Sequence, residues 1–81
     1  MEDIVISIDA VYVPVKRRKT LNPESVESLA LSIIEEGQQS PILVRRDDDR
    51  YVLVEGLHRL EALRALGEET IVANVVQARR R

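Results

Sequence analysis

The sequence has no cysteine, no tryptophan and no phenylalanine, and two tyrosines are the only aromatic residues among 81. The lack of cysteine excludes a disulfide scaffold, a thiol nucleophile and a zinc site built on thiolates. With so few aromatic rings, we expect no surface that stacks successive bases of a single-stranded nucleic acid. No apolar run approaches the roughly 20 residues that cross a bilayer. We therefore expect a cytoplasmic protein that does not contact a membrane.

The charged residues are sorted along the chain, although the formal net charge is only −2. That net charge argues against a protein that coats nucleic acid indiscriminately. Three basic clusters stand out, and the one at residues 79–81 is expected to be a frayed terminus. The other two consist of Lys16, Arg17, Arg18 and Lys19 and of Arg45 and Arg46. If the protein touches DNA, we expect these residues to contact phosphates weakly and with a strong dependence on salt. The alternative is that each cluster is only a solvated surface.

The hydrophobic pattern predicts the order strand, helix, hairpin, helix, strand. Asn22 and Pro23 are typical of a helix start, and Gly37 ends that helix. The second helix is expected from about Leu57 to Leu66. The predicted strands cover residues 4–8, with 11–13 either extending or following this strand, then 42–44 and 51–54 in the hairpin, and 71–76. This order indicates one small α+β domain, in which two main helices pack on a mixed sheet.

The start of the second helix carries the wrong charge for its position. A helix N-terminus has a partial positive charge of about half a unit and several unpaired N–H donors, so acidic residues are favoured there. This helix instead has His58 and Arg59 in its first turn, directly after Gly56. A bound anion would resolve the conflict, because backbone donors, imidazole and guanidinium would converge on one phosphate-sized volume. Gly56 would let that anion approach the backbone closely.

Arg59 needs a partner, because it falls on the same side of the helix as the apolar Leu63. An unpaired charge on such a face is very costly to bury. The partner is either a bound anion or an internal carboxylate. In the second case Arg59 pairs with Glu55 or Glu36, and His58 is merely exposed.

The sequence resembles the ParB/sulfiredoxin superfamily, and within it the ParB-like N-terminal domain, which is also described as the ParB-like nuclease domain. The similarity covers nearly the whole chain in order and spacing. It rests on residues 29–33, on Gly37 with 41–45, on 56–62, and on Leu66 with Gly67. The resemblance implies the α+β fold of that superfamily.

The resemblance also implies a phosphate site for a nucleotide. In ParB-type domains the stretch that matches residues 56–59 binds the phosphates of CTP, which switches a DNA clamp. In sulfiredoxins a similar stretch and two hydroxyls of the first helix hold ATP, and the matching hydroxyls are those of Ser28 and Ser32. The implied ligand is CTP or ATP/ADP, with Mg²⁺. The implied phosphate-binding residues are Ser28, Ser32, Gly56, His58 and Arg59.

Some positions depart from the family patterns. Leu57 replaces the catalytic cysteine of sulfiredoxins, so reduction of cysteine sulfinic acid is not supported. Leu57 also replaces the glutamate of ParB proteins. The His58–Arg59 pair is more similar to the ATP-binding or ADP-binding branches, which include free-serine kinases. By that likeness, Glu55 and His58 become candidate catalytic residues.

Three hypotheses follow. The first is a nucleotide-binding module that acts in chromosome or plasmid partition or regulation, where it controls a partition ATPase or self-association. The second is a small enzyme, either a phosphotransferase or a nuclease. The third is an interaction module with a vestigial pocket, in which Arg59 is paired internally. We expect a single domain over 1–81, without a helix-turn-helix or dimerisation domain, and we favour the first hypothesis.

Overall fold

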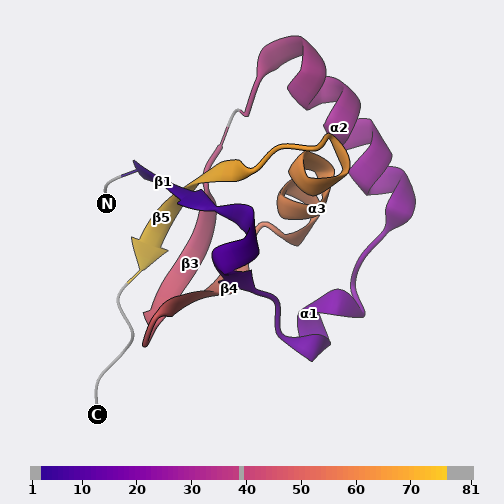
Figure 1. The fold of residues 1–81 in the computed structure, drawn as a ribbon. Coiled ribbons are helices and arrows are strands. Elements are labelled where there is room, and N and C mark those ends of the chain that lie inside the picture. The colour runs from indigo at the N-terminus through magenta and orange to yellow at the C-terminus, as the bar shows by residue number, and fades with distance from the viewer. Residues whose placement is uncertain (1–2, 39, 77–81) are drawn as a thin grey trace.

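The computed structural model describes residues 3–38 and 40–76, which form a mixed five-stranded sheet and its helices (Figure 1). The elements are β1 (Asp3–Ser7), η1 (Ile8–Ala10), β2 (Val11–Tyr12), α1 (Val15–Arg18), α2 (Pro23–Glu36), β3 (Ile42–Asp47), β4 (Arg50–Glu55), α3 (Leu57–Ala65) and β5 (Thr70–Val76). In Figure 1, α3 lies between the sheet and α2, so that the molecule has three layers. The predicted α+β class is confirmed.

The strand order in the sheet is β1-β5-β3-β4-β2. The β3–β4 hairpin is antiparallel, as the sequence predicts, and β1 is antiparallel to β5. The pairs β3–β5 and β2–β4 are parallel, which makes the sheet mixed. The two parallel pairs bring distant segments together, because parallel neighbours need long crossover connections.

The hydrophobic core lies between the sheet and α3. Alternate residues of the strands point towards α3, and on β5 these are Ile71 and Ala73. Ile42, Val44 and Leu60 are completely buried among them. The helix α3 is thus held on the sheet by the side that carries its leucines.

The outer helix, α2, begins where its capping signals predict. The Asn22 side chain accepts hydrogen bonds from the backbone N–H groups of Glu24 and Ser25, at 2.9 and 3.3 Å, and Pro23 opens the helix. Gly37 follows its last turn with φ +78°. None of its residues is fully buried, because α2 packs on α3 and not directly on the sheet.

Two segments differ from the prediction. Residues 15–18 lie outside every predicted helix and strand but form the single turn α1, because the Pro14 carbonyl accepts hydrogen bonds from the backbone N–H groups of Arg17 and Arg18. The first strand ends before Ile8, which opens the short 3-10 turn η1. Within the described ranges, no helix is both long and apolar enough to cross a membrane. The basic cluster at residues 79–81 lies outside these ranges.

Candidate functional site

The start of α3 presents unpaired backbone donors. Gly56 precedes the helix with φ +110° and ψ 28°, and no side chain caps this end. The first intrahelical hydrogen bond runs from the Leu60 N–H to the Gly56 carbonyl, at 2.9 Å. The N–H groups of the first turn, from Leu57 to Arg59, therefore have no partner inside the helix. This is the end of a helix that favours an anion.

Gly56 is a glycine for a reason that the sequence does not reveal. A Cβ atom at this position would lie 2.6 Å from Cγ2 of Ile42 and 2.9 Å from its Cβ. Glycine thus lets the start of α3 approach β3. The close approach seen here is to a strand, and contact of Gly56 with a phosphate stays a prediction.

His58 is engaged with the start of α2. Its Nε2 accepts a hydrogen bond of 3.0 Å from the backbone N–H of Asn22, which lies 36 residues earlier. A backbone N–H can only donate, so Nε2 carries no proton and the ring is the neutral tautomer with its proton on Nδ1. The sequence treats His58 as a potential cation. In the structure it joins two helix starts and retains one N–H donor for a ligand.

We expect His58→Ala to release the Asn22 amide, whereas His58→Gln retains an oxygen acceptor near the same place. The lost hydrogen bond contributes about 0.5–1.5 kcal/mol. Amide hydrogen exchange followed by NMR should therefore show faster exchange at Asn22 in His58→Ala than in His58→Gln. Equal exchange rates in both variants and the wild type would contradict the link between the two helices.

Arg59 has no internal partner among the residues that the structure describes. Its side chain is half-buried, and it forms neither an ion pair nor a side-chain hydrogen bond with any of them. The alternative pairing with Glu55 or Glu36 is therefore absent from this part of the chain. The charge of Arg59 remains available to an anion at the start of α3.

The two predicted serines lie on α2. Ser28 is exposed and Ser32 is half-buried. Ser32 lies four residues after Ser28, so the two hydroxyls share one side of the helix. Their contact with a ligand stays a prediction. Glu55, the candidate catalytic carboxylate, is exposed at the end of β4, directly before Gly56.

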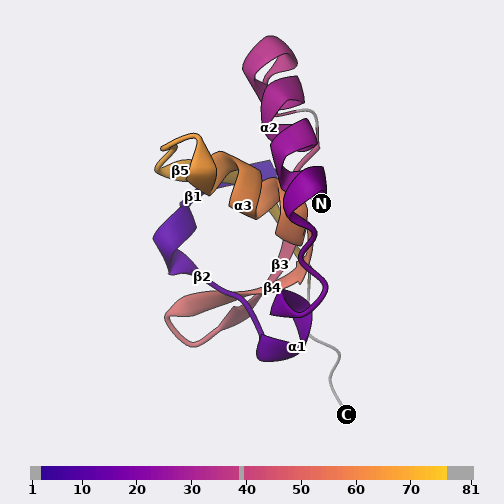
Figure 2. The same cartoon turned by 90° about the vertical axis from the view of Figure 1, so that its right-hand side faces the viewer.

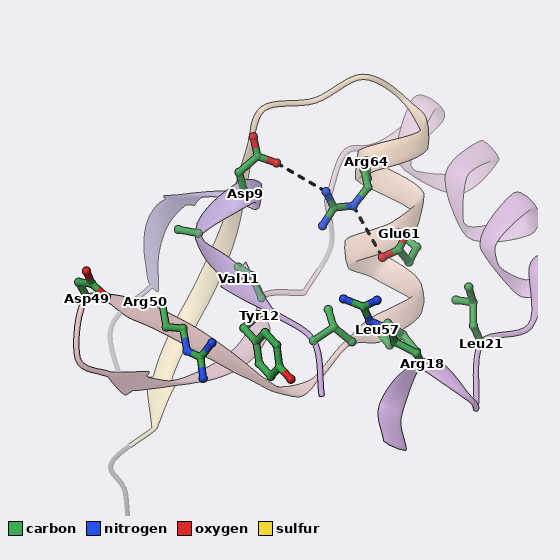
Figure 3. A pocket seen from close by; sticks show the side chains of 12 residues that line it. Asp9, Val11, Tyr12, Arg18, Leu21, Asp49, Arg50, Leu57, Glu61 and Arg64 are labelled. Atoms are coloured by element: carbon green, nitrogen blue, oxygen red, sulfur yellow. Dashed lines mark ion pairs between the residues drawn. The ribbon is translucent and has the colours of Figure 1, made fainter. Parts of the chain in front are cut away.

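A pocket of about 760 Å³ opens beside α3 (Figure 3). It reaches the first turn of α3 through Leu57, and further walls come from η1, β2, the segment 18–21 and the tip of the β3–β4 hairpin. None of the five predicted phosphate-binding residues lines it. Its lining residues are Asp9, Ala10, Val11, Tyr12, Val13, Arg18, Leu21, Asp49, Arg50, Leu57, Glu61 and Arg64. Sequence reasoning missed most of them, because they come from four separate segments.

One wall of this pocket carries an ion-pair cluster of one guanidinium and two carboxylates, which has a net charge of −1. The Arg64 guanidinium lies 3.6 Å from the Asp9 carboxylate and 3.7 Å from that of Glu61, as the dashed lines in Figure 3 show. Arg18, on another wall, forms no ion pair with a described residue. The free positive charge of the pocket therefore lies at Arg18.

The predicted DNA contacts fall on two elements at the same end of the molecule. In Figure 2, α1 and the β3–β4 hairpin both lie at the end away from the last turn of α2. Arg45 and Arg46 are exposed on β3, but Asp47, Asp48 and Asp49 follow them directly. The four basic residues 16–19 are exposed and have no acidic residue among them. The basic character is thus concentrated in α1.

Comparison with known sequences gives one family. A model described as the ParB N-terminal domain matches residues 2–81. The probable chromosome-partitioning protein ParB of Campylobacter jejuni is 36% identical over 73 residues. These residues are 89% of this chain but 26% of that protein, so the chain spans about a quarter of its length.

Two solved structures show the same fold. Sulfiredoxin from Arabidopsis thaliana superposes with a TM-score of 0.86 at 28% identity, over 96% of this chain and 88% of that chain. C-terminally truncated ParB from Caulobacter crescentus, complexed with CTP-gamma-S, gives a TM-score of 0.83 at 30% identity, over 98% of this chain and 46% of that chain. These similarities confirm the resemblance that the sequence motifs indicate.

Proposed function

This chain belongs to the ParB N-terminal domain family, and we propose that it is a nucleotide-binding module acting in DNA partition or its regulation. The observation that carries the proposal is the start of α3. There, unpaired backbone donors and an Arg59 without a partner among the described residues lie in the first turn of α3, and Leu57 of the same turn lines a pocket. The phosphates would bind at the helix start, and the nucleoside would enter the pocket.

The chemistry of these groups fits a nucleotide. Backbone N–H groups at a helix N-terminus and a guanidinium are the usual partners of phosphate in proteins. The neutral His58 would add one N–H donor through Nδ1, and Arg18 would add a second positive charge from the pocket. The CTP-gamma-S complex of the Caulobacter protein supports this assignment.

The nucleotide would bring its own divalent cation. Among residues 3–38 and 40–76, no group of three or more histidine, aspartate or glutamate side chains could hold a metal ion. Mg²⁺ in nucleotide sites is commonly held by substrate phosphates, water and one or two carboxylates. Glu55 is the nearest carboxylate along the chain to the start of α3. We propose binding without rapid turnover, and a Glu55→Gln variant that abolished any turnover would instead favour a phosphotransferase.

Nucleotide binding would act on partners through the basic helix α1. The loop after α1 leads to Asn22, whose N–H is held by His58 in the first turn of α3. A ligand at that turn can therefore change the position of residues 16–19, which we propose contact DNA phosphates. The partner would be DNA together with a partition ATPase or a second copy of the protein.

Melting temperatures of the wild type, Arg59→Gln and Arg45→Gln, measured with CTP, ATP, ADP and GTP and with or without Mg²⁺, test the proposal. A ligand at about a hundred times its dissociation constant adds about 2.7 kcal/mol to stability. In a domain of this size that raises Tm by about 11–22 °C. We expect one nucleotide to give this shift in the wild type and in Arg45→Gln, but not in Arg59→Gln.

Two features of the variants make the comparison of Arg59→Gln with Arg45→Gln specific for the phosphate site. Arg59 has no carboxylate partner among residues 3–38 and 40–76, so its neutral replacement leaves none of these charges unpaired and the free variant should stay folded. Arg45 is exposed on β3 and does not line the pocket, so it controls for the loss of one positive charge. The proposal fails if no nucleotide shifts the wild type, or if Arg59→Gln responds as the wild type does.

A further inference from the structure

Tyr12 and Arg50 form a stacked pair on the wall of the pocket. Tyr12 ends β2, Arg50 begins β4, and the parallel pairing of these strands places Tyr12 beside Val52. The Arg50 guanidinium carbon lies 4.2 Å from the centre of the Tyr12 ring, which is within cation–π distance. Figure 3 shows the two side chains together beside Leu57. Both line the pocket, and Tyr12 is still 39% exposed.

The position of this pair relative to α3 determines what it can contact. Leu57 is the first residue of α3 and lines the same pocket as Tyr12. A nucleotide whose phosphates bind at the start of α3 can place its ribose and base in this pocket, which Leu57 and Tyr12 both line. The pocket volume of about 760 Å³ lies within the range of small-molecule sites, about 300–1,000 Å³.

Among the walls of the pocket, the stacked pair of Tyr12 and Arg50 is the surface that suits a planar ring. Asp9, Glu61 and Arg64 form one ion-pair cluster, in which a single guanidinium faces two carboxylates and the net charge is −1. Val11, Val13 and Leu57 are buried and apolar. Tyrosine and arginine both present a flat, polarisable face, and nucleobases stack on such faces with little dependence on their hydrogen-bonding edges.

We infer that Tyr12, backed by Arg50, is the platform on which the base of the bound nucleotide stacks. This inference rests on the proposed nucleotide site and adds the residue that holds the base. The other tyrosine provides a contrast. Tyr51 is half-buried against the core, carries Arg46 at 5.2 Å from its ring centre, and does not line the pocket.

Because the protein has no tryptophan, its intrinsic fluorescence comes from two tyrosines. In Tyr51→Phe the emission comes from Tyr12, and in Tyr12→Phe it comes from Tyr51. We expect the nucleotide that binds the wild type to quench the emission of Tyr51→Phe in a saturable manner. Tyr12→Phe controls for light absorbed by the nucleotide itself, and its emission should show no saturable change.

Affinity separates a base platform from a structural role. Stacking of one base contributes a factor of about 5–150 in affinity. Tyr12→Leu should therefore bind the nucleotide about 5–150 times more weakly than the wild type, measured by calorimetry. It should bind inorganic triphosphate, which has no base, as the wild type does. Tyr12→Phe should retain most of the nucleotide affinity.

Three outcomes overturn the inference. Unchanged nucleotide affinity in Tyr12→Leu would show that the base does not stack on Tyr12, and it would not contradict the proposed nucleotide site. An equal loss of nucleotide and triphosphate affinity assigns Tyr12 a structural role. If the wild type binds neither nucleotide nor triphosphate, the proposed function fails together with the platform.

Discussion

Gly56→Ala is expected to lose about 2–6 kcal/mol of unfolding free energy, the largest effect of a single methyl group in this protein. A side chain at φ +110° stores about 1–3 kcal/mol of backbone strain. The added Cβ would also lie 2.6 Å from Cγ2 of Ile42, and such overpacking costs about 1–3 kcal/mol more. A domain of this length has a total stability of about 4–12 kcal/mol. Urea unfolding followed by circular dichroism measures the loss.

Gly67→Ala is the matched control. Gly67 follows α3 with φ +82°, but a Cβ atom there would meet no atom within 4 Å. Its replacement should cost only the backbone strain. If Gly56→Ala is no more destabilising than Gly67→Ala, the contact with Ile42 is not what requires a glycine before α3.

The result at Gly56 also bears on the candidate site. If the added methyl group displaces the first turn of α3 from β3 and the protein stays folded, the unpaired N–H groups move with that turn. In that case Gly56→Ala should weaken nucleotide binding even at temperatures where the protein is folded. Gly67→Ala, at the opposite end of α3, should leave binding unchanged.

Leu60→Ala is expected to cost about 2–5 kcal/mol, because it removes a completely buried side chain between α3 and the sheet. The cavity that remains adds to the lost burial of apolar surface. Leu31→Ala makes the same chemical change on α2, where the side chain is 61% exposed. It should change stability by less than about 0.5 kcal/mol.

Urea denaturation of both leucine variants tests how α3 is held. A large loss in Leu60→Ala and a negligible one in Leu31→Ala would show that burial against the sheet stabilises α3. Similar losses in the two variants would contradict the layered arrangement, in which α3 is central and α2 is the outer layer.

Much of the candidate site depends on residues that are far apart in the chain. The charge pattern of the sequence identifies the start of α3, and the structure leaves Arg59 without an internal partner there. The charge pattern does not identify the pocket, because Tyr12, Arg50 and Arg64 come together only through the strand order. The neutral state of His58 follows from a contact with Asn22, which no local pattern contains.

The sequence by itself determined the main strands and helices and their order, but not the short turns η1 and α1. Asn22 with Pro23, Gly37 and Gly67 mark helix ends through hydrogen bonds and backbone angles that involve only a few neighbouring residues. Periodicity likewise predicts the strands from adjacent residues. Such signals are local, so they survive in any arrangement of the elements.

Only the tertiary structure decided which groups meet. The parallel pairing of β2 with β4 stacks Tyr12 on Arg50, and the connection from β3 through β4 and α3 to β5 brings Gly56 beside Ile42. The Gln38 side chain takes the place of a neighbouring strand at Val72. Its Nε2 donates a hydrogen bond of 2.9 Å to the Val72 carbonyl, and its Oε1 accepts one of 3.0 Å from the Val72 N–H. These contacts depend on strand order and register, which arise when distant apolar surfaces pack together into one core.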